Sequence, residues 1–190
     1  MDTLFEIAAC RAMPLTSEQG EQLQTLCERC ADYFELVEGS PPGAAAAQDL
    51  FYALPDGKGF DDKFLIGLFL NSGELIGVID LIRDYPSNGI WYLGLLLLDS
   101  RSRNSGLGAH VYGALERWAS NRGAQEIRLA VVEENTPAYQ FWTRLGFKVI
   151  ERKEPRPFGN KQHAVIVMRR DPELLHGTQR WPNHESDDPL

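Results

Sequence analysis

The sequence predicts an α/β protein whose mixed central sheet combines an antiparallel meander with one parallel pair of strands and is flanked by helices. Between residues 64 and 98, three apolar segments are joined by short turns, and strands joined in this way are antiparallel neighbours. From residue 107 to residue 131, a helical pattern of apolar residues is followed by an alternating strand pattern. Such a strand–helix–strand unit joins two parallel strands by a right-handed crossover.

The elements before the meander have weaker signals. Residues 5–9 alternate between apolar and polar side chains and indicate a first strand. Thr16 and Gln19 have the spacing of a capping box, and the residues after them repeat at helical spacing. The alanine-rich range Ala44–Leu54 is expected to form a second helix.

The meander itself is predicted to contain the strands Phe64–Leu70, Leu75–Ile82 and Ile90–Leu98. Asn71–Gly73 has the composition of a tight turn between the first two strands, and Tyr85–Gly89 forms a longer turn before the third.

Helices and strands alternate in the last third of the chain. The predicted elements, in chain order, are the helix Leu107–Trp118, the strand Ile127–Val131, the helix Pro137–Leu145, and the strands Phe147–Ile150 and Ala164–Met168, which a polar linker, Glu151–Gln162, connects. We expect residues 1–170 to form a single domain. Residues 171–190 are polar, contain three prolines and are expected to form a flexible tail.

Composition restricts the function classes. The net charge of −8 disfavours nucleic-acid binding, which needs a basic surface, and it is compatible with a cationic ligand such as an amine. There is neither an apolar run of about 18 residues nor a basic segment at the N-terminus, so we expect a cytoplasmic protein without a membrane partner. Cys10, Cys27 and Cys30 lack further ligands at metal-site spacing, so they are interpreted as buried apolar residues and no metal is expected.

The most informative segment runs from Leu95 to Gly108. A run of four leucines ends at Asp99, a polar loop with two arginines follows, and Gly106 and Gly108 open a helix. Glycine lets a backbone approach a ligand closely. The unpaired N–H groups of a helix start attract anions, so this segment predicts a pyrophosphate site.

Two cofactor folds use a strand, a glycine-rich turn and a helix. The dinucleotide-binding fold needs the first glycine directly after the strand, but seven residues separate Leu98 from Gly106 here. The third glycine, Gly113, is also two positions late, and an antiparallel meander precedes the unit. These differences exclude the dinucleotide-binding fold.

Two motifs resemble the GCN5-related N-acetyltransferases. Arg103-Asn104-Ser105-Gly106-Leu107-Gly108 matches that family's Arg/Gln-x-x-Gly-x-Gly/Ala signature for acetyl-coenzyme A (acetyl-CoA). After a helix and a strand, Asn135 precedes a segment, residues 138–147, that resembles the family's Ala-x-x-Phe-Tyr-x-x-x-Gly-Phe. The order of elements agrees from Phe64 to Met168.

The resemblance implies acetyl-CoA in a gap between two splayed strands. The pantetheine arm would pair with backbone groups at Leu96 and Leu98, and an N–H near Leu96 or Leu97 would stabilise the oxyanion. Asn135 would hydrogen-bond the same arm, with a plain helix-start role as the alternative. The pyrophosphate would bind the backbone N–H groups of the loop residues Arg103, Asn104, Ser105, Gly106, Leu107, Gly108 and Ala109. The side chain of Arg103 would add its positive charge, with a solvated loop charge as the alternative.

Trp142 stands where the family usually has a tyrosine that serves as general acid. An indole N–H donates a hydrogen bond but supplies no proton, and Trp142 is interpreted most simply as core beside the cofactor. Tyr139, one helical turn earlier, is the candidate replacement, against a packing role. The strand before the loop carries no acid, so Tyr92 is the candidate proton relay; Asp80 and Glu133 are weaker candidates.

The resemblance implies transfer of an acetyl group to a primary amine of a small molecule or a peptide, with homodimers common in the family. The alternative is a non-catalytic acyl-CoA-binding or regulatory module. Residues 32–35, with Trp91 and Tyr92, are a candidate aromatic and acidic cage for the amine, against ordinary helix–sheet packing. His163 faces either the pocket or water.

Overall fold

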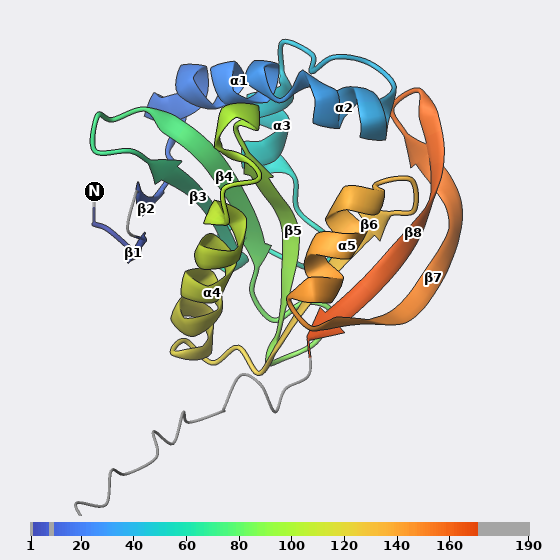
Figure 1. The fold of residues 1–190 in the computed structure, drawn as a ribbon. Coiled ribbons are helices and arrows are strands. Elements are labelled where there is room, and N and C mark those ends of the chain that lie inside the picture. Colours follow the sequence, from blue (N-terminus) through green and yellow to red (C-terminus); the bar gives the residue numbers. More distant parts are fainter. Residues whose placement is uncertain (1, 8–9, 171–190) are drawn as a thin grey trace, which may run out of the picture.

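The computed structural model describes residues 2–7 and 10–170, and its core is one eight-stranded sheet (Figure 1). The strands lie in the order β1-β2-β3-β4-β5-β6-β8-β7, and every neighbouring pair is antiparallel except β5 and β6. Their bounds are β1 Phe5–Ile7, β2 Cys10–Pro14, β3 Lys63–Phe69, β4 Leu75–Ile82, β5 Ile90–Leu98, β6 Glu126–Val132, β7 Phe147–Phe158 and β8 Lys161–Arg170. The predicted mixed α/β sheet is confirmed.

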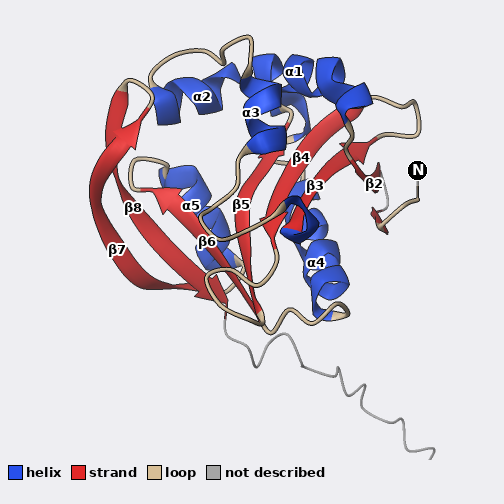
Figure 2. Cartoon of the chain, turned by 180° about the vertical axis from the view of Figure 1, so that it is seen from behind, coloured by secondary structure: helices blue, strands red, loops and turns tan. Residues whose placement is uncertain are grey.

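Helices cover both faces of the sheet. They are α1 Gly20–Arg29, α2 Ala31–Glu38, α3 Ala46–Tyr52, α4 Leu107–Ser120 and α5 Thr136–Arg144, with short 3₁₀ turns η1 Ser17–Gln19, η2 Phe60–Asp62 and η3 Ser100–Ser102. α4 and α5 lie in front of the sheet in Figure 1, and α3 lies in front in the reverse view of Figure 2. Of the helices in the described ranges, none is long and apolar enough to cross a membrane.

A bulge in β5 determines which leucines face which helices. Asp80 of β4 pairs with Leu95 and Leu81 pairs with Leu93, so Gly94 is the extra residue. Before the bulge, Leu93 packs in the core cluster with α4; after it, Leu97 packs in the cluster with α1–α3. An inserted residue reverses the alternation of side chains along a strand, so the side chains after Gly94 point to the faces opposite to those that the alternation before it would give.

The polar linker predicted for residues 151–162 is wrong, because those residues form most of a long β7–β8 hairpin. Every residue of β7 from Lys148 to Pro157 is exposed, so its side chains show no apolar alternation. Antiparallel backbone pairing with β8, which contains two register shifts, holds β7 in the strand conformation instead. A strand segment whose side chains are all exposed and mostly polar therefore has no pattern that the sequence could reveal.

Two further elements were not predicted. β2 pairs with β1 as a hairpin, and α2 follows α1 almost directly. The second predicted helix is real but shorter, as α3. The predicted tail, residues 171–190, lies outside the described residues.

Candidate functional site: a split between two parallel strands

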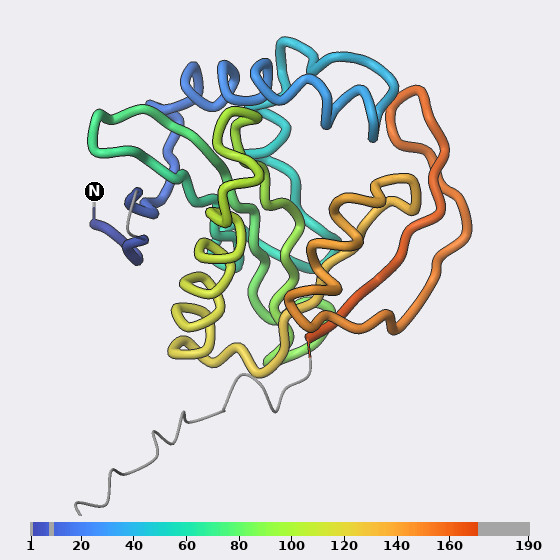
Figure 3. The backbone as a smooth tube through the Cα atoms, viewed as in Figure 1, coloured from blue at the N-terminus to red at the C-terminus, as the bar shows by residue number. Residues whose placement is uncertain are grey.

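β5 and β6 are parallel neighbours over only part of their length. Ile90–Leu93 pairs with Glu126–Leu129, and there the pairing ends. Beyond that point β5 stays with β4 as far as Leu98, and β6 stays with β8 as far as Val132. The two strands therefore diverge, as the backbone trace in Figure 3 shows. We call this region the split.

Backbone groups of β5 point into the split. The N–H of Asp99 donates to the carbonyl of Ile76 at 2.8 Å, on the β4 side. Alternate residues of a strand direct their N–H and C=O groups to the same neighbour, so those of Leu97 also face β4. Leu96 and Leu98 face the split, where no strand pairs with them in the described part of the chain. Of the three leucines predicted to serve a ligand, Leu96 has both backbone groups directed into the split, and Leu98 has its N–H there, while its carbonyl accepts from Arg103 Nε and the Cys30 thiol.

The loop at the head of the split also has unpaired N–H groups. Asn104 (φ 60°) and Gly106 (φ 81°) have left-handed backbones, and Gly106 caps the start of α4. Within the described residues, no hydrogen-bond acceptor lies on the N–H groups of Asn104, Ser105, Gly106 or Gly108. The N–H of Ala109, by contrast, donates to the carbonyl of Gly106 at 3.1 Å. Four of the seven predicted phosphate-binding positions thus present a donor at the positive end of a helix dipole.

Gly108 is small for a packing reason. A Cβ at this position would lie 3.2 Å from the ring of Phe141 and 3.6 Å from the side chain of Leu98. Gly108 therefore lets α5 approach the start of α4 and the end of β5. Gly106 is a glycine for a different reason, its positive φ.

Arg103 holds the loop to α2. Its Nε donates to the carbonyl of Leu98 at 2.8 Å, and its two terminal nitrogens contact the carboxylate of Asp32. The pairing lowers the pKa of Asp32. Three of the five guanidinium N–H donors serve these contacts, and the side chain also interacts with the buried Cys30, so Arg103 is neither a plain solvated charge nor a fully free one.

The end of β5 is fixed by a buried carboxylate. Asp99 is fully buried and pairs with Arg29 Nε at 2.6 Å and with Arg101 at 2.8 Å. The guanidinium of Arg101 and, less strongly, the charge of Arg29 lower the pKa of Asp99 to about 2 against the opposing effect of burial. Arg101 is neutralised by Asp99 and Glu74, so it brings little charge to the loop.

Asn135 and Trp142 occupy the start and the middle of α5. The side-chain oxygen of Asn135 accepts from the N–H of Ala138 at 3.1 Å, which is the helix-start role, and its NH₂ group remains available. The ring of Trp142 is buried at edge-to-face distances from two rings, Tyr112 at 5.5 Å and Phe147 at 5.3 Å. This position supports the interpretation of Trp142 as core.

The two candidate catalytic tyrosines lie on opposite faces of the sheet. Tyr139 packs against the cluster that contains α4, whereas Tyr92 points away from it because the adjacent Leu93 belongs to that cluster. Burial raises the pKa of Tyr92, against the smaller effect of the Arg156 charge. Its ring contacts Tyr85 at 5.7 Å.

The alternative base candidates both have cationic partners. Both carboxylate oxygens of Asp80 lie 2.8 Å from Lys63 Nζ, which also donates to the carbonyl of Ala53. Burial raises the pKa of Asp80 more than Lys63 lowers it. Glu133 pairs with Arg152 at the surface.

The predicted cation cage is not formed as expected. Trp91 is 1% exposed and stacks on Phe64 at 5.3 Å between the rings, on the α4 side of the sheet. Phe34 is buried as well, and Asp32 is occupied by Arg103. Trp91 belongs to the wrong face because it alternates with Tyr92, so the prediction that both join one cage is wrong.

The cysteine interpretation is confirmed. Cys10, Cys27 and Cys30 are free thiols and buried. Burial raises the pKa of Cys27 to about 12, so it carries no thiolate at neutral pH.

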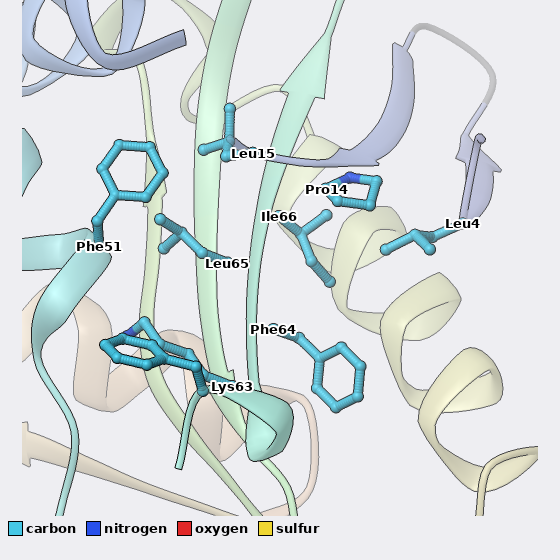
Figure 4. A pocket seen from close by; sticks show the side chains of 9 residues that line it. Leu4, Pro14, Leu15, Phe51, Lys63, Phe64, Leu65 and Ile66 are labelled. Atoms are coloured by element: carbon cyan, nitrogen blue, oxygen red, sulfur yellow. The ribbon is translucent and has the colours of Figure 1, made fainter. Parts of the chain in front are cut away.

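A pocket of about 320 Å³ lies away from the split, beside the start of β3 (Figure 4). Apolar side chains dominate its wall, and its one charged residue, Lys63, is paired with Asp80. The lining residues are Leu4, Pro14, Leu15, Phe51, Phe60, Lys63, Phe64, Leu65 and Ile66.

Sequence analysis named Asp32 and His163 as candidates but did not indicate the partners that they have at the split. Asp32 is 71 residues from its partner Arg103. His163 is buried and contacts Glu134 and the carbonyl of Val37, so it faces neither the pocket nor water. No local pattern marks such pairs; only the packing of α2 against the loop and the hairpin brings them together.

Known proteins share both the sequence pattern and the fold. The family model for the acetyltransferase (GNAT) family matches residues 24–147, which is more than half of the chain. A curated relative described as the uncharacterized N-acetyltransferase YobR of Bacillus subtilis (strain 168) is 27% identical over 126 residues, 66% of this chain and 47% of that protein. The chain thus spans about half the length of that relative.

Solved structures have the same architecture. An acetyltransferase from Thermus thermophilus is 24% identical with a TM-score of 0.66, covering 86% of this chain and 98% of that one. A GCN5-related N-acetyltransferase from Brucella melitensis is 17% identical with a TM-score of 0.71, covering 89% and 78%. Together with the family match, these findings establish that the chain belongs to the acetyltransferase (GNAT) family.

Proposed function

We propose that this protein is an acetyl-CoA-dependent N-acetyltransferase that acts on a primary amine of a small molecule or a peptide. One observation carries the proposal: the unpaired edge of β5 leads directly to a loop whose N–H groups are also unpaired. An extended ligand with an anionic end fits both parts at once.

The residues present fit coenzyme A. Leu96 and Leu98 would hold the pantetheine arm through backbone groups, and the NH₂ group of Asn135 would add a donor from the far side of the split. The N–H groups of Asn104, Ser105, Gly106 and Gly108 would hold the pyrophosphate. Arg103 would contribute its positive charge without leaving Asp32.

When bound, acetyl-CoA supplies a thioester that an amine attacks to form an amide. The N–H of Leu96 faces the split and is the candidate oxyanion donor, since that of Leu97 faces β4. Tyr92 would take part in removing the ammonium proton through water, because its raised pKa opposes direct action as a base. Tyr139 is the proposed donor toward the sulfur side.

A non-catalytic acyl-CoA-binding module is the second candidate function. The position of Trp142 favours it, because this side chain donates hydrogen bonds only and is enclosed by aromatic rings. A module of this kind would keep the binding features of the split and lack turnover.

The test combines calorimetry with CoA and an assay for free thiol released from acetyl-CoA with a panel of primary amines. We expect binding and, with at least one amine, turnover. Gly106→Glu should weaken CoA binding at least about a hundredfold, because it places a carboxylate and a strained backbone at the phosphate site. Gly123→Glu is the matched control: Gly123 has a φ of 98°, has open space around it and ends the same helix.

The outcomes separate the candidates. Binding with no turnover for any amine would leave the binding module, and full CoA affinity in Gly106→Glu would refute the placement of the pyrophosphate. A homodimer and a cytoplasmic location stay predictions.

A further inference from the structure

The tip of the β7–β8 hairpin caps the C-terminal end of α2. Lys161 Nζ donates to the carbonyls of Glu35 and Leu36 at 2.8 and 3.0 Å. The N–H of Asn160 donates to the carbonyl of Glu38 at 2.7 Å. His163 Nε2 lies 2.9 Å from the carbonyl of Val37. The last four carbonyls of a helix lack partners within it and form the negative end of its dipole, so a hairpin carrying cations stabilises this end.

His163 also contacts the turn between β6 and α5. Its Nδ1 lies 2.6 Å from a carboxylate oxygen of Glu134, the residue before Asn135. A carbonyl accepts only, so Nε2 must carry a proton to bond Val37. With an ionised carboxylate on Nδ1, both contacts are hydrogen bonds only when the ring carries two protons. The ring is 4% exposed, so water does not substitute for either partner.

We propose that His163 is a positioning residue that fixes the turn carrying Asn135 to the end of α2, and thereby sets the geometry of the split. This inference rests on the proposed function. The other end of α2 is already tied to the phosphate loop, through Asp32 and Arg103. α2 thus spans from the loop on the β5 side to the hairpin and turn on the β6 side (Figures 1 and 2). Among the hydrogen bonds of the described residues, those of His163 link the helix to the turn.

Several charged groups surround the ring. Glu134 contacts it from the turn, Lys161 lies two residues away on the same strand, Arg156 lies at the paired position of β7, and Glu38 follows Val37 at the end of α2. The backbone N–H of Glu134 and, less strongly, His163 lower the pKa of the Glu134 carboxyl. A ring with a single proton would make only one of the two hydrogen bonds.

The first experiment does not depend on CoA. The N–H of Ala138 is bonded to Asn135, so its amide hydrogen exchange reports the order of the turn. In His163→Gln we expect its protection to fall about fivefold, with the same loss in Glu134→Gln and no further loss in the double variant. Lys161→Gln is the matched control, because Lys161 caps α2 without hydrogen-bonding the turn.

The second experiment measures CoA binding by calorimetry. We expect both His163→Gln and Glu134→Gln to bind CoA about fivefold more weakly than the wild type, with no further loss in the double variant. Lys161→Gln should keep the wild-type affinity. Glu134 is half exposed, so Glu134→Gln tests the contact even where His163→Gln fails to fold.

Unchanged protection of Ala138 in Glu134→Gln, or wild-type CoA affinity in that variant, would overturn the proposal. Absence of CoA binding by the wild type would refute the proposed function instead, and the exchange experiment would still decide the role of His163.

Discussion

Two of the strand edges that lack a partner strand within the described residues, those of β7 and β5, are built in opposite ways. The strand β7 carries charged side chains at half of its positions, two prolines, Pro155 and Pro157, and two register shifts. The inner edge of β5, from Leu95 to Leu98, carries four leucines and no charge. One edge resists pairing with another chain, whereas the other has no such protection.

Open edges present unpaired N–H and C=O groups, and proteins usually blunt them with charges, prolines or bulges. β7 uses all three devices. β5 has a bulge at Gly94, but the bulge lies where β5 and β6 begin to diverge and reverses the side chains instead of ending the strand. The comparison teaches that β5 is an edge made to be covered, and a bound ligand is the neighbour that its backbone lacks.

The test with the largest expected effect removes single backbone N–H donors from β5 by proline substitution. Leu97→Pro removes an N–H that faces β4, so the free energy of unfolding should fall by about 3 kcal/mol or more. Leu96→Pro removes an N–H that faces the split, so it should destabilise the fold by at least about 1 kcal/mol less, while CoA affinity falls about tenfold. Urea unfolding and calorimetry measure the two effects. Equal destabilisation by both substitutions would contradict the assignment of the two edges.

A second test concerns the carboxylate that ends β5. The folded-state pKa of Asp99 is lowered from 3.8 to about 2, so its contribution to stability is present above its ordinary pKa and is lost as pH falls through about 2. Asp99→Asn should lower the free energy of unfolding at neutral pH by about 1–2 kcal/mol. The variant and the wild type should converge as the pH falls from about 4 to about 2.

Urea unfolding at several pH values measures this convergence. Asp56→Asn is the control, because Asp56 is exposed and has no ion pair in the described part of the chain. A constant difference between Asp99→Asn and the wild type at all pH values would assign the effect to packing instead of charge.

The smallest expected change in stability comes from the outer edge. Glu151 and Lys153 form an exposed pair at 3.8 Å next to Val149 and Ile150, which are 48% and 40% exposed. Replacing both charged residues with valine should change the free energy of unfolding by less than about 1 kcal/mol. It should, however, produce concentration-dependent self-association, measured by light scattering, because the edge then becomes apolar and β-prone.

A control adds two valines elsewhere, in Glu18→Val with Glu21→Val, at exposed positions of the first helical segment. Association of both double variants to the same extent would show that apolar surface, not the strand edge, is responsible.

The sequence predicted the elements in which periodicity reflects burial. The bounds of β4 and β5 agree with the prediction, and α4 begins where predicted, because one face of each element packs in a core. β7 was missed because an exposed edge strand needs no apolar alternation. α2 was missed because eight residues directly after α1 give too short a pattern to separate from it.

The candidate site was predictable where it depends on local backbone chemistry. Gly106 requires a positive φ and Asn135 caps a helix, and both features have a sequence signature. Long-range pairs have none: the partners of Arg103 and His163 come from α2, and only the folded sheet brings them together. The assignment of Trp91 to a cage failed for a related reason, since its face of the sheet depends on strand register.

The contacts between the C-terminal end of α2 and the β7–β8 hairpin, which we call the clasp, also have a consequence for the order of folding. Val37 and His163 are 126 residues apart, whereas β3, β4 and β5 pair through short turns. Closing a long loop costs more conformational entropy than closing a hairpin, so the meander forms readily and the clasp forms late. During synthesis, the carbonyls at the end of α2 therefore lack these hydrogen-bond partners until β7 and β8 have been made. The region around the split is therefore completed only after β7 and β8 have been made.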